Sequence, residues 1–305
     1  MKRRTALHLV TGKGGVGKST FAAALAIAAA RGGRRVLAIE MGSPAGLSGL
    51  FGVRPPAHGL AVAVAPGVSL AYYDGEAALA EYLLKHVPLR GLMNAVFSHP
   101  LYRAFVAAGP GVRELMAIGK VRDEQLGLST GGPLWDLIVV DAGASGHALQ
   151  LLGMPAATAR TFKSGLAHRE ATRVANSLAD PETTSVHVVA LPEEMPLEEA
   201  AEIIERLRDE LRLPVGRLVI NQCRPAPPSG AAAALAALRD GGADPARREL
   251  ALAAGRALGW LRLQEEGIAA LERRVELEAR RLPRLDAEPF GRAEVERLAA
   301  ELEVA

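Results

Sequence analysis

The sequence contains very little cysteine. Its 305 residues include a single one, Cys223, which excludes an internal disulfide and a metal site built from four cysteines of one chain. A chain without a disulfide framework is typical of a reducing compartment, so we expect the protein in the cytoplasm. Aromatic residues are also scarce, at 4% of the chain against 49% hydrophobic residues. The core is therefore expected to be aliphatic.

Long apolar runs and an excess of one charge are also missing. The longest apolar run covers residues 21–30, whereas a membrane-spanning helix needs roughly 18 apolar residues. Basic residues followed by the apolar stretch 6–10 superficially resemble a secretion signal, but the stretch is too short. Thirty-six Lys and Arg against 34 Asp and Glu give a net charge of +2. We expect no nucleic-acid partner and at most peripheral contact with a membrane.

A glycine-rich loop follows the apolar stretch 6–10 directly. It fits the pattern of a glycine, four residues, and then Gly-Lys-Ser. Its residues are Gly12, Lys13, Gly14, Gly15, Val16, Gly17, Lys18, Ser19 and Thr20. Small residues let successive N–H groups point at a polyphosphate, and a helix that begins near Lys18 directs its positive end at the same anion. The loop predicts a nucleotide site where Lys18 contacts the terminal phosphates and Ser19 binds Mg²⁺.

Strands and helices alternate along the chain, as is typical of a parallel sheet. Strands are expected at residues 6–10, 35–39, 135–141, 185–191 and 216–220. Two shorter stretches, 59–64 and 68–72, are strands or a hairpin around Pro66-Gly67. Helices are expected after the glycine loop and at 197–212, 231–238 and 245–278. We predict an α/β fold, a mostly parallel P-loop sheet flanked by helices, in one domain over residues 1–305.

An all-helical insertion is expected over residues 76–126, where apolar residues recur at helical spacing. It contains three of the few aromatic residues, Phe97, Tyr102 and Phe105, together with the adaptable side chain of Met93. Two interpretations stay open. These residues pack the core of the insertion itself, or they line a groove for a hydrophobic client.

Asp141 ends the apolar stretch 135–141, at the carboxyl end of an expected strand, where α/β sheets bind ligands. A carboxylate is the hard anionic oxygen ligand that Mg²⁺ prefers. Gly143 and Gly146 let the backbone that follows move with the γ-phosphate. We therefore expect Asp141 and Ser19 to form the metal site.

Two segments carry a family resemblance. Lys13, directly after the first glycine, makes the loop resemble the deviant Walker A motif of dimeric P-loop ATPases. The segment Asp-Ala-Gly-Ala-Ser-Gly-His-Ala-Leu that begins at Asp141 resembles switch II of the ArsA-type branch, the arsenite-pump and tail-anchored-protein-targeting ATPases. The resemblance implies that Lys13, Lys18 and Asp141 serve ATP hydrolysis with Mg²⁺, and that His147 takes part in the switch.

The resemblance also implies partners and an adenine site. In that family Lys13 would reach across a homodimer or heterodimer to the partner's nucleotide, and the helical insertion would hold a hydrophobic protein client. Asn221-Gln222 after an expected strand resembles the adenine-recognising Asn-Gln pair of the family. The segment 282–291, which includes Pro283, resembles the loop that packs on the adenine.

The chain departs from the family pattern at switch I. Ser43 stands where the family has an aspartate that orients the attacking water. A hydroxyl is no carboxylate base at neutral pH, so slow hydrolysis is expected, with Glu40 as a possible substitute three residues earlier. The zinc-binding Cys-x-x-Cys of the eukaryotic targeting members and the arsenite-binding cysteines are both absent, since Cys223 is alone.

Two alternative functions remain open from the sequence. The first is a non-catalytic, ATP-sensing partner or scaffold of a related ATPase, in keeping with Ser43. The second is a positioning ATPase of the MinD/ParA type. Membrane-binding members of that group end in a basic amphipathic helix, whereas residues 292–305 hold four glutamates and two arginines, which disfavours this alternative.

Overall fold

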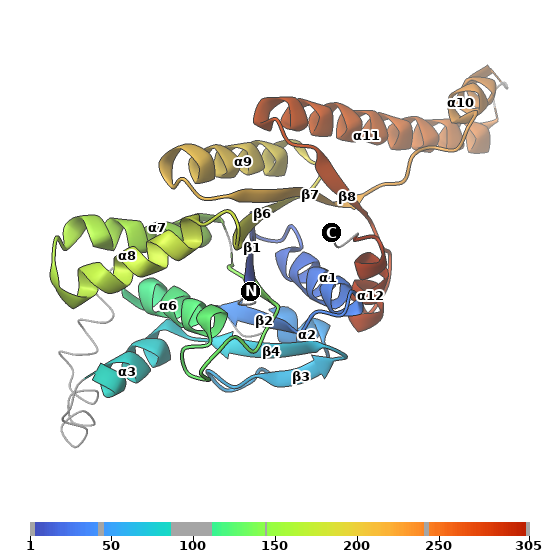
Figure 1. The fold of residues 1–305 in the computed structure, drawn as a ribbon. Helices are drawn as coiled ribbons and strands as arrows, with labels where there is room; N and C mark the ends of the chain where they lie inside the picture. Colours follow the sequence, from blue (N-terminus) through green and yellow to red (C-terminus); the bar gives the residue numbers. More distant parts are fainter. Residues whose placement is uncertain (1–3, 42–45, 87–111, 144, 241–243, 303–305) are drawn as a thin grey trace, which may run out of the picture.

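The fold is built on one mixed sheet (Figure 1). The structure, a computed structural model, describes residues 4–41, 46–86, 112–143, 145–240 and 244–302. In that part the sheet has eight strands in the order β3-β4-β2-β5-β1-β6-β7-β8, with every neighbouring pair parallel except β3 and β4. The strands are β1 Ala6–Gly12, β2 Val36–Met41, β3 Val62–Ala65, β4 Val68–Tyr73, β5 Leu137–Asp141, β6 Thr184–Ala190, β7 Val215–Cys223 and β8 Ala279–Pro283. The predicted α/β class, with its mostly parallel sheet, is confirmed.

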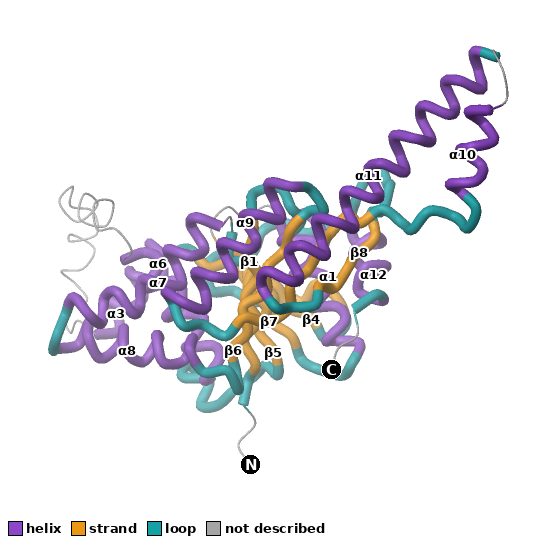
Figure 2. Tube along the Cα trace, turned by 90° about the horizontal axis from the view of Figure 1, so that it is seen from above, coloured by secondary structure: helices purple, strands orange, loops and turns teal. Residues whose placement is uncertain are grey.

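Helices cover both faces of the sheet (Figure 1). Their bounds are α1 Lys18–Arg31, α2 Gly46–Leu50, α3 Gly75–His86, α6 Val112–Leu126, α7 Ser145–Thr161, α8 Gly165–Ala179, α9 Glu194–Glu205, α10 Ala231–Asp240, α11 Pro245–Val275 and α12 Arg292–Ala300. A π-helical turn, Arg206–Glu210, continues α9. None of the helices in the described ranges is long and apolar enough to cross a membrane. In Figure 2 the beginning of α11 and all of α10 extend beyond the rest of the molecule.

Alternating strand residues divide the core into two layers, because successive side chains of a strand point to opposite faces. Leu7 and Leu9 of β1 lie in the layer formed with α6, α7, α8, α9 and the last turns of α11. Val10 lies in the other layer, with α1, α2 and α12. From Phe21 to Ala29 every residue of α1 is buried, as expected for a helix that is apolar all round.

The sequence-based strand predictions hold, and residues 62–73 form the expected hairpin around Pro66-Gly67. The chain near the C-terminus differs from the prediction in two ways. The helix expected over 245–278 ends at Val275, where Glu276 adopts a left-handed backbone conformation (φ 52°). Residues 279–283, of which only 282 and 283 carried a prediction, as the start of a loop, form β8, an edge strand parallel to β7. The run Ala-Arg-Arg-Leu-Pro lacks the apolar pattern of a central strand. It is a strand only because it pairs with β7, and that pairing cannot be read from the local sequence.

The expected helical insertion is described only at its two ends, α3 and α6, which pack against each other. Met93, Phe97, Tyr102 and Phe105 lie outside the described residues. The boundaries of this insertion, and the single-domain assignment, stay predictions.

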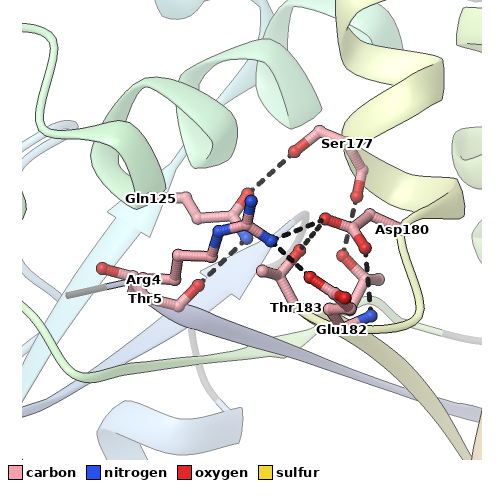
Figure 3. A network of polar contacts seen from close by, with 8 residues as sticks. Arg4, Thr5, Gln125, Ser177, Asp180, Glu182 and Thr183 are labelled. Atoms are coloured by element: carbon pink, nitrogen blue, oxygen red, sulfur yellow. Dashed lines mark hydrogen bonds and ion pairs between the residues drawn. The ribbon is translucent and has the colours of Figure 1, made fainter. Parts of the chain in front are cut away.

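A polar network fastens the helical layer to the sheet at the amino end of β1 (Figure 3). Gln125 of α6 is 4% exposed, donates from Nε2 to the carbonyl of Thr5 at 3.1 Å and accepts from Ser177 Oγ of α8 at 3.0 Å. The Thr5 hydroxyl donates to the carbonyl of Trp135 at 2.7 Å. One amide therefore joins two helices to the central strand, and truncating it would leave buried polar groups without partners.

Two histidines on neighbouring strands form a second buried contact. His187 Nδ1 accepts from the backbone N–H of Arg217 at 2.9 Å, so the proton must sit on Nε2, which donates to His8 Nδ1 at 3.1 Å. A Cβ at Gly216 would lie 2.7 Å from His187 Nδ1, so only glycine fits beside this ring. Burial, followed by the positive charges of Arg34 and Arg217, lowers the pKa of His8 to about 4.

This pair predicts acid destabilisation. The unfolded chain binds a proton at each histidine below about pH 6.5, whereas the folded state keeps the pKa of His8 near 4 and that of His187 well below its usual value. Stability is therefore fully present above about pH 6.5 and falls as the pH drops, by up to about 3 kcal/mol from His8 alone. Urea unfolding at several pH values measures this slope.

The His8→Gln variant tests the assignment, because its amide oxygen can still accept from His187 but does not titrate. We expect a shallower loss of stability below pH 6.5 than in the unaltered protein. Equal slopes for the two proteins would contradict the assignment.

Candidate functional site

The glycine loop joins β1 to α1 and lies close to two other strands. A Cβ at Gly12 would stand 2.1 Å from the carbonyl oxygen of Val189 in β6, and one at Gly17 would stand 2.2 Å from Nδ2 of Asn221 in β7. Both glycines also have positive φ, 146° and 91°. Side chains at these two positions would therefore displace the loop from the carboxyl ends of β6 and β7.

Lys18 folds back over the loop. Its side chain donates from Nζ to the carbonyl of Lys13 at 2.8 Å and is 8% exposed. Burial lowers its pKa, against the opposing effect of the Asp141 and Glu199 charges. Among the described residues no side chain caps the start of α1, so the N–H groups of its first turn are available near the Lys18 ammonium. This arrangement suits an anion such as a phosphate.

Ser19 and Asp141 come together beside Lys18. The Ser19 hydroxyl donates to Asp141 Oδ2, while Asp141 Oδ1 is buried and has no hydrogen-bond partner among the described residues. Burial raises the pKa of Asp141, and the Ser19 hydrogen bond and the Lys18 charge oppose that rise. A buried carboxylate oxygen without a partner and a neighbouring hydroxyl are together suitable ligands for a hard cation. Asp141 and Ser19 therefore fit Mg²⁺.

Glu40 lies beside Asp141, in register with it on the neighbouring strand β2. Both of its carboxylate oxygens hold the start of α2, since Oε1 accepts from the N–H of Leu47 at 2.8 Å and Oε2 accepts from Ser48 Oγ at 2.6 Å. Glu40 therefore anchors the segment after switch I and is not free to replace a missing base. The sequence analysis missed this role, because the contact spans seven residues and lies outside the short spacing of a helix-capping pattern.

The same anchored segment approaches the metal ligands. A Cβ at Gly46 would stand 2.6 Å from Ser19 Oγ, so the start of α2 lies directly against Ser19. Ser43, three residues earlier, lies outside the described residues. The side chain of His147 is likewise not described, so its expected switch role stays a prediction.

The residues expected at the adenine border a cavity of about 640 Å³ beside the loop. Its lining includes Thr20, Asn221, Gln222 and Pro283. Asn221 is 4% exposed and donates from Nδ2 to the carbonyl of Val16 at 2.9 Å, so it braces the loop. Gln222 is exposed, has a left-handed backbone (φ 58°) and is one of the residues that line the cavity, and its expected role at the adenine stays a prediction.

Lys13 forms an ion pair that the sequence did not predict. Its Nζ lies 3.3 Å from the carboxylate of Glu199 on α9, within the same chain. Three more glutamates of α9, Glu194, Glu198 and Glu202, line the same cavity of about 530 Å³. Lys13 is therefore directed along α9, toward the outside of the nucleotide loop.

Cys223 is a buried, free cysteine. It is 7% exposed, and burial raises its pKa to about 11. Across the described ranges, no group of three or more His, Cys, Asp or Glu side chains could hold a metal ion. Ser19 and Asp141 stay the predicted ligands of a cation, which would need further ligands from outside the protein.

A glycine loop between a central parallel strand and a buried helix, with Lys18, Ser19 and Asp141 converging on it, defines a P-loop nucleotide-binding protein. Within this class, the sequence model of the family described as anion-transporting ATPase (ArsA_ATPase) matches residues 5–173 and 166–239. The chain belongs to this family of ATPases.

Relatives come from bacteria and plants. ATPase BagA of Mycobacterium tuberculosis (strain ATCC 25618 / H37Rv) is 36% identical over 225 residues, which cover 72% of this chain and 66% of BagA. The arsenical pump-driving ATPase of Escherichia coli is 29% identical over 209 residues, 63% of this chain and 35% of that protein. ATPase GET3C of Arabidopsis thaliana is 26% identical over 265 residues, 72% of this chain and 67% of its own length. The chain thus spans about two thirds of BagA (66%).

The Asp141 site predicts opposite effects on stability and on metal binding. Asp141→Asn removes a charge that burial disfavours, so the stability of the ligand-free protein should stay the same or rise. The same change should weaken Mg²⁺-dependent ATP binding by about 10- to 100-fold. Thermal unfolding and calorimetric titration with and without Mg²⁺ measure the two effects.

Asp136→Asn is the matched control, since Asp136 pairs with Arg35 at the other end of β5, 3.1 Å away. It should leave Mg²⁺ dependence unchanged and lower stability slightly. A loss of stability in Asp141→Asn, with Mg²⁺ dependence retained, would refute the metal-site assignment.

Proposed function

We propose that this protein is an ATP-binding, Mg²⁺-dependent ATPase of the ArsA type, whose nucleotide closes a dimer and repositions helices that hold a hydrophobic client. The observation that carries the proposal is the contact between Ser19 and Asp141, with the orphaned Oδ1 of Asp141 next to Lys18. We place its action in the cytoplasm, in keeping with a single, buried cysteine.

Each residue of the loop has a role in this proposal. Lys18 exchanges the carbonyl of Lys13 for phosphate oxygens, and the N–H groups at the start of α1 bind the same oxygens. Ser19 and Asp141 hold Mg²⁺, which neutralises charge on the phosphates when bound. Gln222 and Pro283 recognise the adenine from the adjoining cavity, while Asn221 braces the loop.

Dimer closure is assigned to Lys13. The pair with Glu199 keeps Lys13 on its own chain, and both side chains are about one third exposed, so solvent weakens the attraction. Binding of a second chain that carries nucleotide would offer Lys13 a phosphate in place of a carboxylate. The partner is a second copy or a related ATPase.

The client site is assigned to the helical insertion over residues 76–126. The described ends of this insertion, together with α8, enclose a cavity of about 500 Å³. Tyr82, Leu115 and Met116 line it alongside charged residues of α6 and α8. Flexible methionine next to an aromatic ring suits a hydrophobic peptide of variable sequence.

A non-catalytic, ATP-sensing role is the second candidate, and one observation favours it. The carboxylate nearest to Ser43 in the sequence, Glu40, is committed to Leu47 and Ser48. With Ser43 in switch I, no carboxylate is then assigned to orient water. The first candidate function predicts slow ATP hydrolysis, and the second predicts no hydrolysis.

A single-turnover assay separates the candidates. The unaltered protein should bind ATP and release phosphate slowly, and Lys18→Ala should lose at least about tenfold in ATP affinity because a charged phosphate contact is removed. Ser43→Asp should speed the chemical step at least about tenfold, since a general base typically contributes 10²- to 10⁴-fold. Failure of the unaltered protein to bind ATP would refute both candidates, and tight binding without phosphate release would leave the second.

The Lys13 pair gives a further prediction. Glu199→Gln removes the competing carboxylate, so the affinity of the ATP-bound dimer should rise by up to about fivefold, the scale of a partly exposed ion pair. Lys13→Ala should abolish ATP-dependent dimerisation while ATP affinity stays within a few-fold. Sedimentation velocity with a non-hydrolysable ATP analogue measures both, with Glu202→Gln as a control one turn along α9. ATP-dependent dimers of Lys13→Ala would count against the assignment.

A further inference from the structure

A helical hairpin projects from the body of the protein (Figure 2). It consists of α10 and of residues 245–263 of α11. The buried residues of α11 are Gln264, Ile268, Leu271 and Val275 near its end, whereas Ala251 is the single buried residue before them. Residues 245–263 of α11 therefore pack on α10 and not on the sheet.

The hairpin exposes large apolar side chains. Leu250, Leu252, Trp260 and Leu263 are between 55% and 62% exposed. The outer residues of α10 are exposed alanines, at positions 232, 233, 234, 236 and 237. Surface helices normally turn such residues toward a core, so this hairpin is apolar where a water-exposed helix would be polar.

The apolar side chains are spread around α11. At about 100° per residue, Leu263 lies within about 20° of Leu252, Trp260 lies about 80° away, and Leu250 lies about 160° away on the opposite side. α10 approaches α11 near Gly255, where a Cβ would meet Leu235 and Arg239, and its Leu238 borders a cavity of about 460 Å³ together with Ala251 and Leu252. A folded partner seated on one face would leave the others exposed, whereas a fluid layer can surround the hairpin.

Arginines alternate with these apolar residues. Residues 245–263 contain Arg247, Arg248, Arg256 and Arg262 against one acid, Glu249. Arginine side chains can lay their apolar stems along a hydrophobic surface while the guanidinium reaches a polar layer. Arginine, tryptophan and leucine together, with this excess of positive charge, are the residue types of helices that lie in the headgroup region of a membrane.

We propose that the α10–α11 hairpin docks peripherally on a lipid surface with anionic headgroups, with Trp260 and Leu263 in the headgroup and acyl boundary and the arginines among the headgroup phosphates. The charge excess sets this occupant apart from a second copy of the chain, because an isologous contact between two hairpins would bring like charges together. The distribution of apolar side chains around α11 favours a lipid surface over a folded protein as the occupant.

The hairpin is fixed to the nucleotide-binding body at its base. Gln264, 5% exposed, accepts at Oε1 from the N–H of Arg224 at 2.9 Å and donates from Nε2 to its carbonyl at 3.3 Å. Glu265 pairs with Arg281 of β8 at 2.6 Å. Arg224 directly follows β7, the strand that carries Asn221 and Gln222. Docking would therefore hold the nucleotide site at a set distance from the lipid surface.

Vesicle flotation without nucleotide tests the proposal independently of ATP binding. We expect binding to vesicles of phosphatidylcholine with added phosphatidylglycerol, none to phosphatidylcholine alone, and weaker binding at high salt. Arg256→Gln/Arg262→Gln should weaken binding about 30-fold, from about 1 kcal/mol for each arginine near the surface. The emission of Trp260 should shift to the blue on binding, and Trp260→Phe should lack this shift.

The matched control is Arg273→Gln/Arg297→Gln, which removes the same charge from exposed positions on the body of the protein and should bind as the unaltered protein does. Thermal unfolding verifies that every variant is folded. Three results would overturn the proposal: no binding to phosphatidylglycerol vesicles, equal losses in the two double variants, or a blue shift of Trp260 with protein concentration in the absence of lipid, which would identify a second copy as the occupant.

Discussion

The close approach of the glycine loop to strands β6 and β7 is the constraint on which the rest of the site depends. Gly12 lies against the Val189 carbonyl and Gly17 against the Asn221 amide, with no room for a Cβ at either position. This contact fixes where α1 begins, so the N–H groups of its first turn lie near the Lys18 ammonium. The sheet order, with β1 between β5 and β6, then brings Asp141 to the same edge.

The cost of burying charge explains how the surroundings of Asp141 and Glu40 differ. Asp141 and Glu40 end neighbouring strands, and each is almost completely enclosed. Two buried carboxylates side by side are costly unless each is compensated. Glu40 is satisfied by the start of α2, whereas Asp141 has one oxygen on Ser19 and one without a partner in the described part of the chain. This asymmetry fits two different roles, the observed anchor for Glu40 and the proposed metal ligand for Asp141.

The packed core and the exposed apolar surface of α11 lie in different parts of the molecule. The two core layers pack nearly every apolar residue of β1, β5 and β6, while the large exposed apolar side chains of α11 gather on the hairpin outside them. Gln264 marks the boundary, since it is the first residue of α11 whose polar atoms are satisfied by the body of the protein. The proposed nucleotide site, near the end of β7, and the proposed docking hairpin therefore lie on either side of the contact between Arg224 and Gln264.

The sequence by itself determined the loop, the parallel sheet and the strand-ending Asp141, because phosphate binding and buried strands require local patterns of glycine and apolar residues. It did not reveal β8, the cap that Glu40 provides, or the pair of Lys13 with Glu199. Each of these joins residues that local patterns leave unrelated: β8 becomes a strand only beside β7, and Glu199 reaches Lys13 only because α9 packs across the sheet edge. Tertiary structure decided them, since the partner that stabilises each one is supplied by packing rather than by neighbouring sequence.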